Sequence, residues 1–237
     1  MSTKSIELST PDGPMRTHVA HPTRTPTAGV IVIMEAFGLN NHIAGIADRL
    51  AAEGFLAVAP DLYHRYENKV VGYDELDAIF EMMGNLLDSQ ALMDVDAAID
   101  YLASQGISND KVGITGFCMG GRITFLTAIS RPVAAAVTYY GGAIVTEGFS
   151  PNQPQLSNRH GELKCPWLGL FGDMDSMIPT DKLEELRSNL EHSAQPTDLV
   201  RYPEADHGFF CDERPSYNAA AASDAWQRTL SWFRTHL

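Results

Sequence analysis

One cysteine of the 237-residue chain has the neighbours of a catalytic nucleophile. Cys118 is the central residue of Gly116-Phe117-Cys118-Met119-Gly120, a Gly-x-nucleophile-x-Gly turn with Cys where Ser is commoner. Glycines two positions before and after the nucleophile let a strand and a helix approach closely at a strained turn. The start of the following helix would favour a thiolate. The motif predicts an exposed nucleophilic thiol, and its structural alternative is a small packed hydrophobe.

Two further residues supply the groups that such a thiol needs. Asp175 and His207 each follow an expected strand, and the chain order of nucleophile, acid and histidine is that of the α/β-hydrolases. His207 would accept the thiol proton and later protonate the leaving group, while Asp175 would fix the imidazole tautomer. Asp173 is the competing acid. Asp175 is favoured because it lies nearer the turn into the next helix, which would leave Asp173 as a turn residue.

Backbone N–H groups on either side of the thiol could bind an oxyanion. The N–H of Met119 is the first in the predicted helix, and that of Ala36 lies in the loop expected to supply the second donor. Glu35 is unusual because it ends an otherwise apolar strand. A partly buried carboxylate there could hold or remove the thiol proton. Its alternative is a loop carboxylate that reaches solvent or a neighbouring N–H.

The elements that must position these residues alternate between strands and helices. Alternation of this kind predicts a mostly parallel sheet covered by helices on both faces, with the reactive groups at the carboxyl ends of strands. An antiparallel hairpin is expected from Ile6–Ser9 and Met15–Ala20. The other expected strands are residues 28–34, 55–60, 111–117, 133–140, 165–172 and 197–202. Helices are expected after Asn40 or Asn41, over 74–87 and 88–105, after the Cys118 turn, over 181–192, and at the C-terminal end.

Length and composition limit the class of protein. The length favours a single α/β domain over residues 1–237. A net charge of −13 without a Lys/Arg cluster argues against nucleic acid or an anionic membrane as a partner. No apolar run approaches the ~18 residues of a membrane span, and no export signal is expected. The three cysteines are spaced for neither a disulfide framework nor a zinc knuckle. We therefore expect a cytoplasmic protein.

At this point the chain resembles a known family, the dienelactone hydrolases (carboxymethylenebutenolidases). The matching segments cover nearly the whole chain in the right order. They are Val30–Gly38 with Glu35-Ala36-Phe37-Gly38, Pro60-Asp61-Leu62-Tyr63, the Cys118 turn, Gly172-Asp173-Met174-Asp175 with Pro179, and Ala205-Asp206-His207-Gly208-Phe209. The resemblance implies an α/β-hydrolase fold, with a mostly parallel central sheet flanked by helices on both faces.

The resemblance also implies a mechanism. Cys118, His207 and Asp175 would form a triad, and Glu35 would be a gate that contacts the resting thiol and helps to generate the thiolate. The thiolate would attack an ester or lactone carbonyl, and water activated at His207 would hydrolyse the acyl-thioester. No metal or organic cofactor is implied. The expected partner is a small-molecule ester or lactone, and the expected state is a monomer or weak dimer.

Substrate recognition departs from the family pattern. Dienelactone hydrolases hold the substrate carboxylate with two arginines, but residues 72–83 contain no Arg, and Cys211 stands four residues after His207. Arg214, Arg65 and Arg122 are possible substitutes, each with a surface or helix-end role as its alternative. The aromatic residues near the motifs could line a pocket for a less charged ester, or could be core. They are Phe37, Tyr63, Phe117, Phe209 and Phe210.

Two other functions compete with ester hydrolysis. A class I glutaminase also places Cys in a Gly-x-Cys-x-Gly turn, but it expects His-x-Glu downstream, whereas His207 is followed by Gly208-Phe209. A non-catalytic binding protein could keep the same fold. Ammonia release from glutamine would identify the first, and binding of a partner without acyl-enzyme formation would identify the second.

Overall fold

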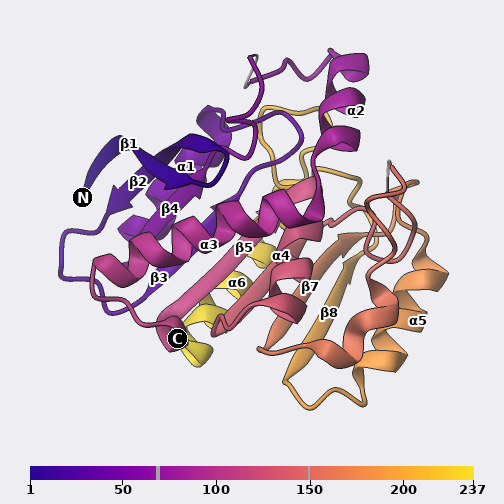
Figure 1. The fold of residues 1–237 in the computed structure, drawn as a ribbon. Coiled ribbons are helices and arrows are strands. Elements are labelled where there is room, and N and C mark those ends of the chain that lie inside the picture. The colour runs from indigo at the N-terminus through magenta and orange to yellow at the C-terminus, as the bar shows by residue number, and fades with distance from the viewer. Residues whose placement is uncertain (68–69, 149) are drawn as a thin grey trace.

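Eight strands form one sheet through the centre of the protein, which we describe from a computed structural model over residues 1–67, 70–148 and 150–237 (Figure 1). The strands are β1 (Ser2–Thr10), β2 (Gly13–His21), β3 (Gly29–Ile33), β4 (Leu56–Pro60), β5 (Val112–Phe117), β6 (Ala135–Tyr139), β7 (Trp167–Gly172) and β8 (Thr197–Tyr202). Their order is β1-β2-β4-β3-β5-β6-β7-β8. The β1–β2 and β2–β4 pairs are antiparallel and the other pairs are parallel, so the predicted hairpin and mostly parallel sheet are confirmed.

Helices cover both faces of this sheet. They are α1 (Asn41–Ala52), α2 (Leu76–Asn85), α3 (Asp88–Ser104), α4 (Met119–Ser130), α5 (Thr180–Leu190) and α6 (Ala219–His236), with short 3-10 helices at Asn109–Lys111 and Ser157–Glu162. Helices α3 and α4 pack together on the face toward the viewer in Figure 1, and α6 lies behind the sheet. On that far face the guanidinium of Arg49 in α1 stacks on Trp226 of α6, 4.1 Å from the ring centroid.

The element boundaries follow local chemistry. All five residues of β3 and of β4 are buried, as expected for apolar strands at the centre of a parallel sheet. Helix α1 begins where the Asn40 side chain accepts a hydrogen bond from the N–H of Ile43, so Asn40 is the cap. Helix α2 is shorter than the predicted 74–87 because Leu86 is extended and ends it. No helix among the described residues is long and apolar enough to cross a membrane.

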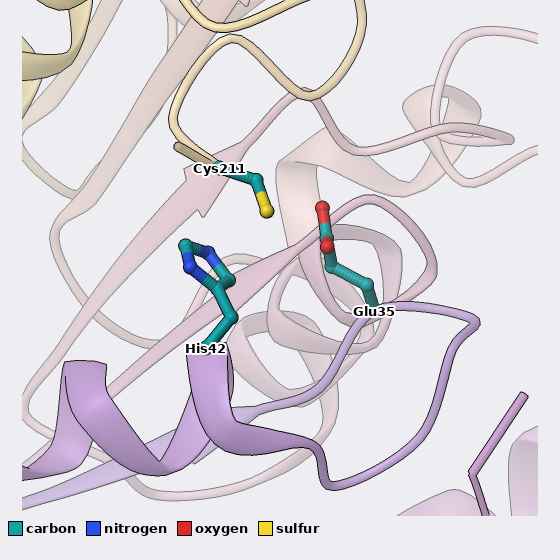
Figure 2. Close-up of side chains that lie close together, drawn as sticks. All are labelled: Glu35, His42 and Cys211. Carbon is teal, nitrogen blue, oxygen red and sulfur yellow. The ribbon is translucent and has the colours of Figure 1, made fainter. Parts of the chain in front are cut away.

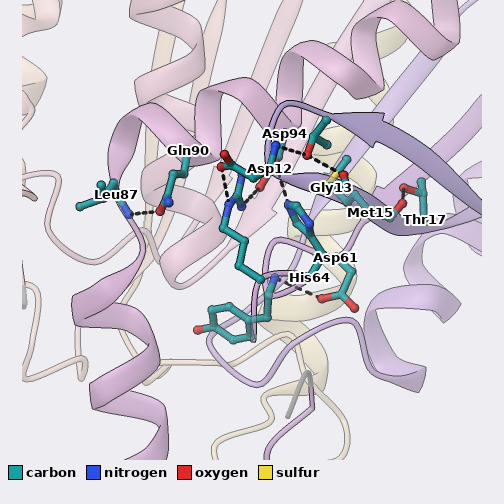
Figure 3. A network of polar contacts seen from close by, with 12 residues as sticks. Asp12, Gly13, Met15, Thr17, Asp61, His64, Leu87, Gln90 and Asp94 are labelled. Carbon is teal, nitrogen blue, oxygen red and sulfur yellow. Dashed lines mark hydrogen bonds and ion pairs between the residues drawn. The ribbon is translucent and has the colours of Figure 1, made fainter. Parts of the chain in front are cut away.

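A buried ionic network fastens the loop after β4 to α3. Asp94 in α3 is fully buried and accepts hydrogen bonds from Arg65 at 2.7 and 2.9 Å. The Nε2 atom of His64 lies 3.1 Å from the same carboxylate, and Arg65 also donates to Asp12 in the β1–β2 turn (Figure 3). The guanidinium of Arg65 therefore has a structural role in these ion pairs, and Arg65 does not line the cavity beside Cys118.

Candidate active site

Cys118 stands alone between the end of β5 and the start of α4. Its φ of 54° and ψ of −116° are rare for a residue with a Cβ, so the turn is strained. Glycine is required on both sides of it. A Cβ on Gly116 would lie 2.2 Å from the carbonyl oxygen of Gly120, and one on Gly120 would lie 2.5 Å from the carbonyl oxygen of Ile33. The predicted strand–turn–helix context of the thiol is confirmed, and its side chain is partly exposed.

The structure brings Asp175 to His207. The Nδ1 atom of His207 lies 2.6 Å from Oδ2 of Asp175, while Oδ1 of Asp175 accepts the N–H of Met177 at 2.9 Å. Both residues of the pair are buried, so the imidazole is held on its Nδ1 side. Asp173 instead pairs with Arg201 at 2.6 Å. Of the two acids considered from the sequence, only Asp175 contacts His207.

The charge state of His207 depends on its two neighbours. Burial lowers the pKa of His207, but the charge of Cys118 and the hydrogen bond to Asp175 outweigh burial and raise this pKa to about 10. The Nε2 atom of His207 makes no hydrogen bond of standard geometry with any described residue. His207, Cys118 and Arg214 all line one cavity, so the imidazole and the thiol face a common space.

The two expected oxyanion donors also border this cavity. Ala36 and Met119 both line it. Because Met119 is the first residue of α4, its N–H has no carbonyl acceptor within the helix. The positive end of the α4 dipole is directed toward the same place. An oxyanion formed on a substrate bound at Cys118 would lie beside these groups.

Glu35 is fully buried, so the alternative interpretation, a loop carboxylate that reaches solvent, is wrong. Its Oε1 atom accepts a hydrogen bond from the hydroxyl of Tyr140 at 3.2 Å and lies 3.6 Å from Nη1 of Arg214. Burial, and then the charge of Glu35, raise the pKa of Tyr140 well above its usual value, so Tyr140 is the donor. Among the hydrogen bonds of the described residues, none joins Glu35 to Cys118.

The cavity has a volume of about 190 Å³ and a mostly apolar wall. Phe37 and Arg214 line it, as expected for substrate-binding residues, and the guanidinium of Arg214 stacks on the Phe37 ring at 5.3 Å. Arg122 also reaches the wall, but its guanidinium makes a two-point ion pair with Asp88. Of the two arginines that line the cavity, Arg214 therefore has the nitrogen, Nη1, that makes no hydrogen bond with a described residue.

Four of the five aromatic residues considered for the pocket belong instead to the core. Tyr63, Phe117 and Phe209 are fully buried, Phe210 is 3% exposed, and none of the four lines the cavity. Phe117 stacks on Tyr139 with ring centroids 4.5 Å apart, and the hydroxyl of Tyr63 contacts the sulfur of Met119 at 3.5 Å. The backbone directs these rings into the core and not into the cavity, so closeness to the motifs in sequence did not predict which side chains line the cavity.

Helix α2 supplies apolar wall residues that sequence reasoning missed. Ile79, Phe80 and Met83 line the cavity, and Phe80 is 46% exposed. Their i, i+1 and i+4 spacing was visible as one side of a helix, but the pattern alone did not say whether that side meets core or cavity. The absence of arginine from this helix leaves the α2 side of the cavity uncharged.

Comparison with known proteins relates the whole arrangement to one family. The model of the dienelactone hydrolase family matches residues 15–237. A relative from Escherichia coli O157:H7, named "Putative carboxymethylenebutenolidase", is 39% identical over 213 residues, which cover 89% of this chain and 78% of the relative. A relative of the same name from Saccharolobus solfataricus is 31% identical, and the match covers 98% of this chain and 98% of the relative.

A solved structure agrees with these sequence matches. The crystal structure described as "Putative Dienelactone Hydrolase" from Klebsiella pneumoniae has a TM-score of 0.89 and 37% identity to this chain, with 99% of both chains covered. The likeness extends through the sheet and the flanking helices. It confirms the α/β-hydrolase fold expected from the sequence.

Proposed function

Because the chain belongs to the dienelactone hydrolase family, we propose that it hydrolyses a carboxylic ester or lactone with Cys118 as nucleophile. The observation that carries this proposal is the strained, partly exposed Cys118 at a cavity shared with His207, whose other nitrogen lies 2.6 Å from Asp175. A thiol and an imidazole so placed can transfer a proton between them.

Acylation starts from a thiolate–imidazolium pair. His207 holds the proton of Cys118 at Nε2, and the buried Asp175 stabilises this imidazolium through Nδ1. The thiolate attacks the substrate carbonyl, and the N–H groups of Ala36 and Met119 stabilise the tetrahedral oxyanion. When the oxyanion collapses, His207 protonates the leaving alcohol and the acyl group stays on Cys118 as a thioester.

Deacylation repeats the same proton transfers with water. His207 removes a proton from a water molecule, which attacks the thioester carbonyl, and the departing thiolate of Cys118 is restored. The product acid then leaves. Glu35 acts in this proposal through Arg214 and Tyr140, which it contacts, and its expected gating of the thiol would require the carboxylate to leave them.

The wall of the cavity favours a substrate with an apolar body. Ile79, Phe80 and Met83 of α2 present no charge, while Arg214 offers a cation whose Nη1 atom makes no hydrogen bond among the described residues. We propose an ester or lactone with at most one carboxylate, bound near Arg214. This differs from recognition by two arginines, which is the pattern that the family resemblance implies.

The test is hydrolysis of a dienelactone and of a p-nitrophenyl ester series by the wild type and by Cys118→Ala. Intact-mass measurement would detect the acyl-enzyme. The proposal expects turnover and a transient acyl adduct in the wild type, and loss of both in the variant by about 10³-fold or more. Full activity in Cys118→Ala would refute the mechanism. No turnover and no adduct in freshly reduced wild-type protein would favour a non-catalytic binding protein.

A further inference from the structure

Three side chains of types that can bind a metal meet beside the active site, two from neighbouring segments near the start of the chain and one from near its end. Glu35 follows β3, His42 lies in α1, and Cys211 lies in the loop before α6. Figure 2 shows the carboxylate, the imidazole and the sulfur directed toward one another. Their ligand atoms all lie within 4.8 Å of one another, and all three residues are buried. This cluster, Glu35–His42–Cys211, is separate from Cys118, His207 and Asp175.

Two atoms of the cluster lack a partner. The Oε2 atom of Glu35 and the Nε2 atom of His42 are buried and have no hydrogen bond among the described residues. A buried polar atom without a partner costs roughly 1–3 kcal/mol, so native proteins usually satisfy such atoms with protein, water or an ion. The Sγ atom of Cys211 contacts the Tyr73 hydroxyl at 3.4 Å, which leaves room for a second interaction.

We propose that Glu35, His42 and Cys211 bind one Zn²⁺ ion. Carboxylate oxygen, imidazole nitrogen and thiolate sulfur are each zinc ligands, and a thiolate disfavours Mg²⁺ and Ca²⁺. Zinc bonds of roughly 2.0–2.3 Å place tetrahedral ligand atoms about 3.3–3.8 Å apart. Side-chain rotations that move these atoms by about 1 Å would therefore reach zinc-binding distances. Water takes the fourth position.

A surface pocket supplies a path to the cluster. This second pocket, of about 400 Å³, is lined by His42, Asp212 and Glu213. The exposed carboxylate of Asp212 lies 3.7 Å from Nδ1 of His42, and its charge would draw a cation toward the imidazole. The pocket therefore brings solvent to His42, one of the three ligands, and Cys118 does not line it.

The charges around the cluster are compatible with a divalent ion. Arg214 is the nearby cation, but its Nη1 atom faces Oε1 of Glu35, whereas Oε2 is the unpartnered oxygen. Zinc binds the thiolate and not the thiol, so Cys211 releases its proton to solvent when the zinc–sulfur bond forms. The carboxylate and the thiolate then balance the two charges of zinc.

Metal binding is tested in Cys118→Ala, which removes the catalytic thiol as a competing ligand. Equilibrium dialysis against Zn²⁺ should give one ion per chain, and Co²⁺ in its place should give the visible spectrum of a tetrahedral site with a thiolate-to-cobalt charge-transfer band. Adding Cys211→Ser or His42→Ala should weaken zinc binding by at least about 100-fold. Matched controls are Cys165→Ala, at a buried thiol, and His192→Ala, at an exposed imidazole, each of which should retain the site.

Two results would overturn the proposal. One is the absence of stoichiometric zinc in Cys118→Ala, and the other is equal binding after Cys211→Ser. Circular dichroism would show whether the Cys211 and His42 variants fold. If they do not, the cobalt spectrum of Cys118→Ala decides alone, because a bound ion without a thiolate band excludes Cys211 as a ligand. None of these readouts depends on ester hydrolysis, so a failure of one proposal is distinguishable from a failure of the other.

Discussion

Asp175 is the residue whose role the geometry defines most sharply. Its carboxylate both holds Nδ1 of His207 and accepts the N–H of Met177. Asp175→Asn keeps the shape but favours the wrong imidazole tautomer, so we expect kcat to fall by about 10³–10⁴. Asp173→Asn is the matched control, because that carboxylate pairs with Arg201 and should change kcat less than about threefold. Steady-state kinetics on a p-nitrophenyl ester separates the two, and equal losses would contradict the assignment.

The titration of His207 gives a second prediction at this scale. A pKa of about 10 means that the imidazolium persists through neutral pH, so activity should have its alkaline limb near pH 10. Because this pKa is raised above its unfolded value near 6.5, the corresponding stability is fully present below pH 6.5 and is lost as pH rises through about 10. NMR titration should show a lower His207 pKa in Cys118→Ala, where the thiolate charge is absent. An unchanged pKa would mean that the two residues are not coupled.

At the scale of elements, the nucleophile turn requires the start of α4 to lie close to the end of β3. A Cβ at Gly120 meets the backbone of Ile33 and Met34 at 2.5 Å, and backbone cannot move aside cheaply. We expect Gly120→Ala to lower the free energy of unfolding by about 2–3 kcal/mol and to reduce activity further by displacing Cys118. Urea unfolding measures the first effect and esterase kinetics the second.

Gly45 provides the control for this change. It lies within α1 and an added Cβ would meet nothing within 4 Å. Gly45→Ala should therefore raise stability by about 0.5–1 kcal/mol through helix propensity and leave activity unchanged. Comparable losses from both substitutions would show that the Gly120 contacts are not the cause.

The network around Asp94 is a second prediction about elements. Asp94→Ala leaves Arg65 without its buried partner and should cost about 3–5 kcal/mol of stability. Asp96 lies two residues further along the same helix, and its carboxylate, which is 41% exposed, pairs with Arg131. Asp96→Ala should therefore lower the free energy of unfolding by less than about 1 kcal/mol. Thermal unfolding of the two variants tests the contrast. Equal shifts in Tm would mean that burial does not decide the strength of these pairs.

At the scale of the whole molecule, the sequence predicted what depends on local pattern. Apolar runs located the strands, and the glycines around Cys118 predicted the turn because backbone contact leaves no alternative residue. The structure also pairs Asp175, and not Asp173, with His207, while the role of Asp175 as the catalytic acid stays a prediction. These features depend on chain geometry within a few residues, which a sequence displays directly.

Features that depend on tertiary packing could not be predicted in the same way. Phe117 and Phe37 both neighbour a motif, yet one packs in the core and the other lines the cavity, because strand pleat and loop path direct them differently. The meeting of Glu35, His42 and Cys211 joins three segments whose separation in sequence gives no spacing signal. The sequence singled out Glu35 as an acid at the end of an apolar strand, but its contacts with Tyr140 and Arg214 could be seen only in the fold.

The unequal burial of the three cysteines has a practical consequence. Cys165 and Cys211 are at most 1% exposed, and burial raises the pKa of Cys165 to about 12, whereas Cys118 is partly exposed beside a cavity. A brief exposure of the native protein to iodoacetamide should therefore add one carbamidomethyl group per chain, at Cys118, with loss of activity in proportion. Denatured protein should add three. The amount of carbamidomethyl group added to the native protein would thus give the fraction of functional molecules in a preparation.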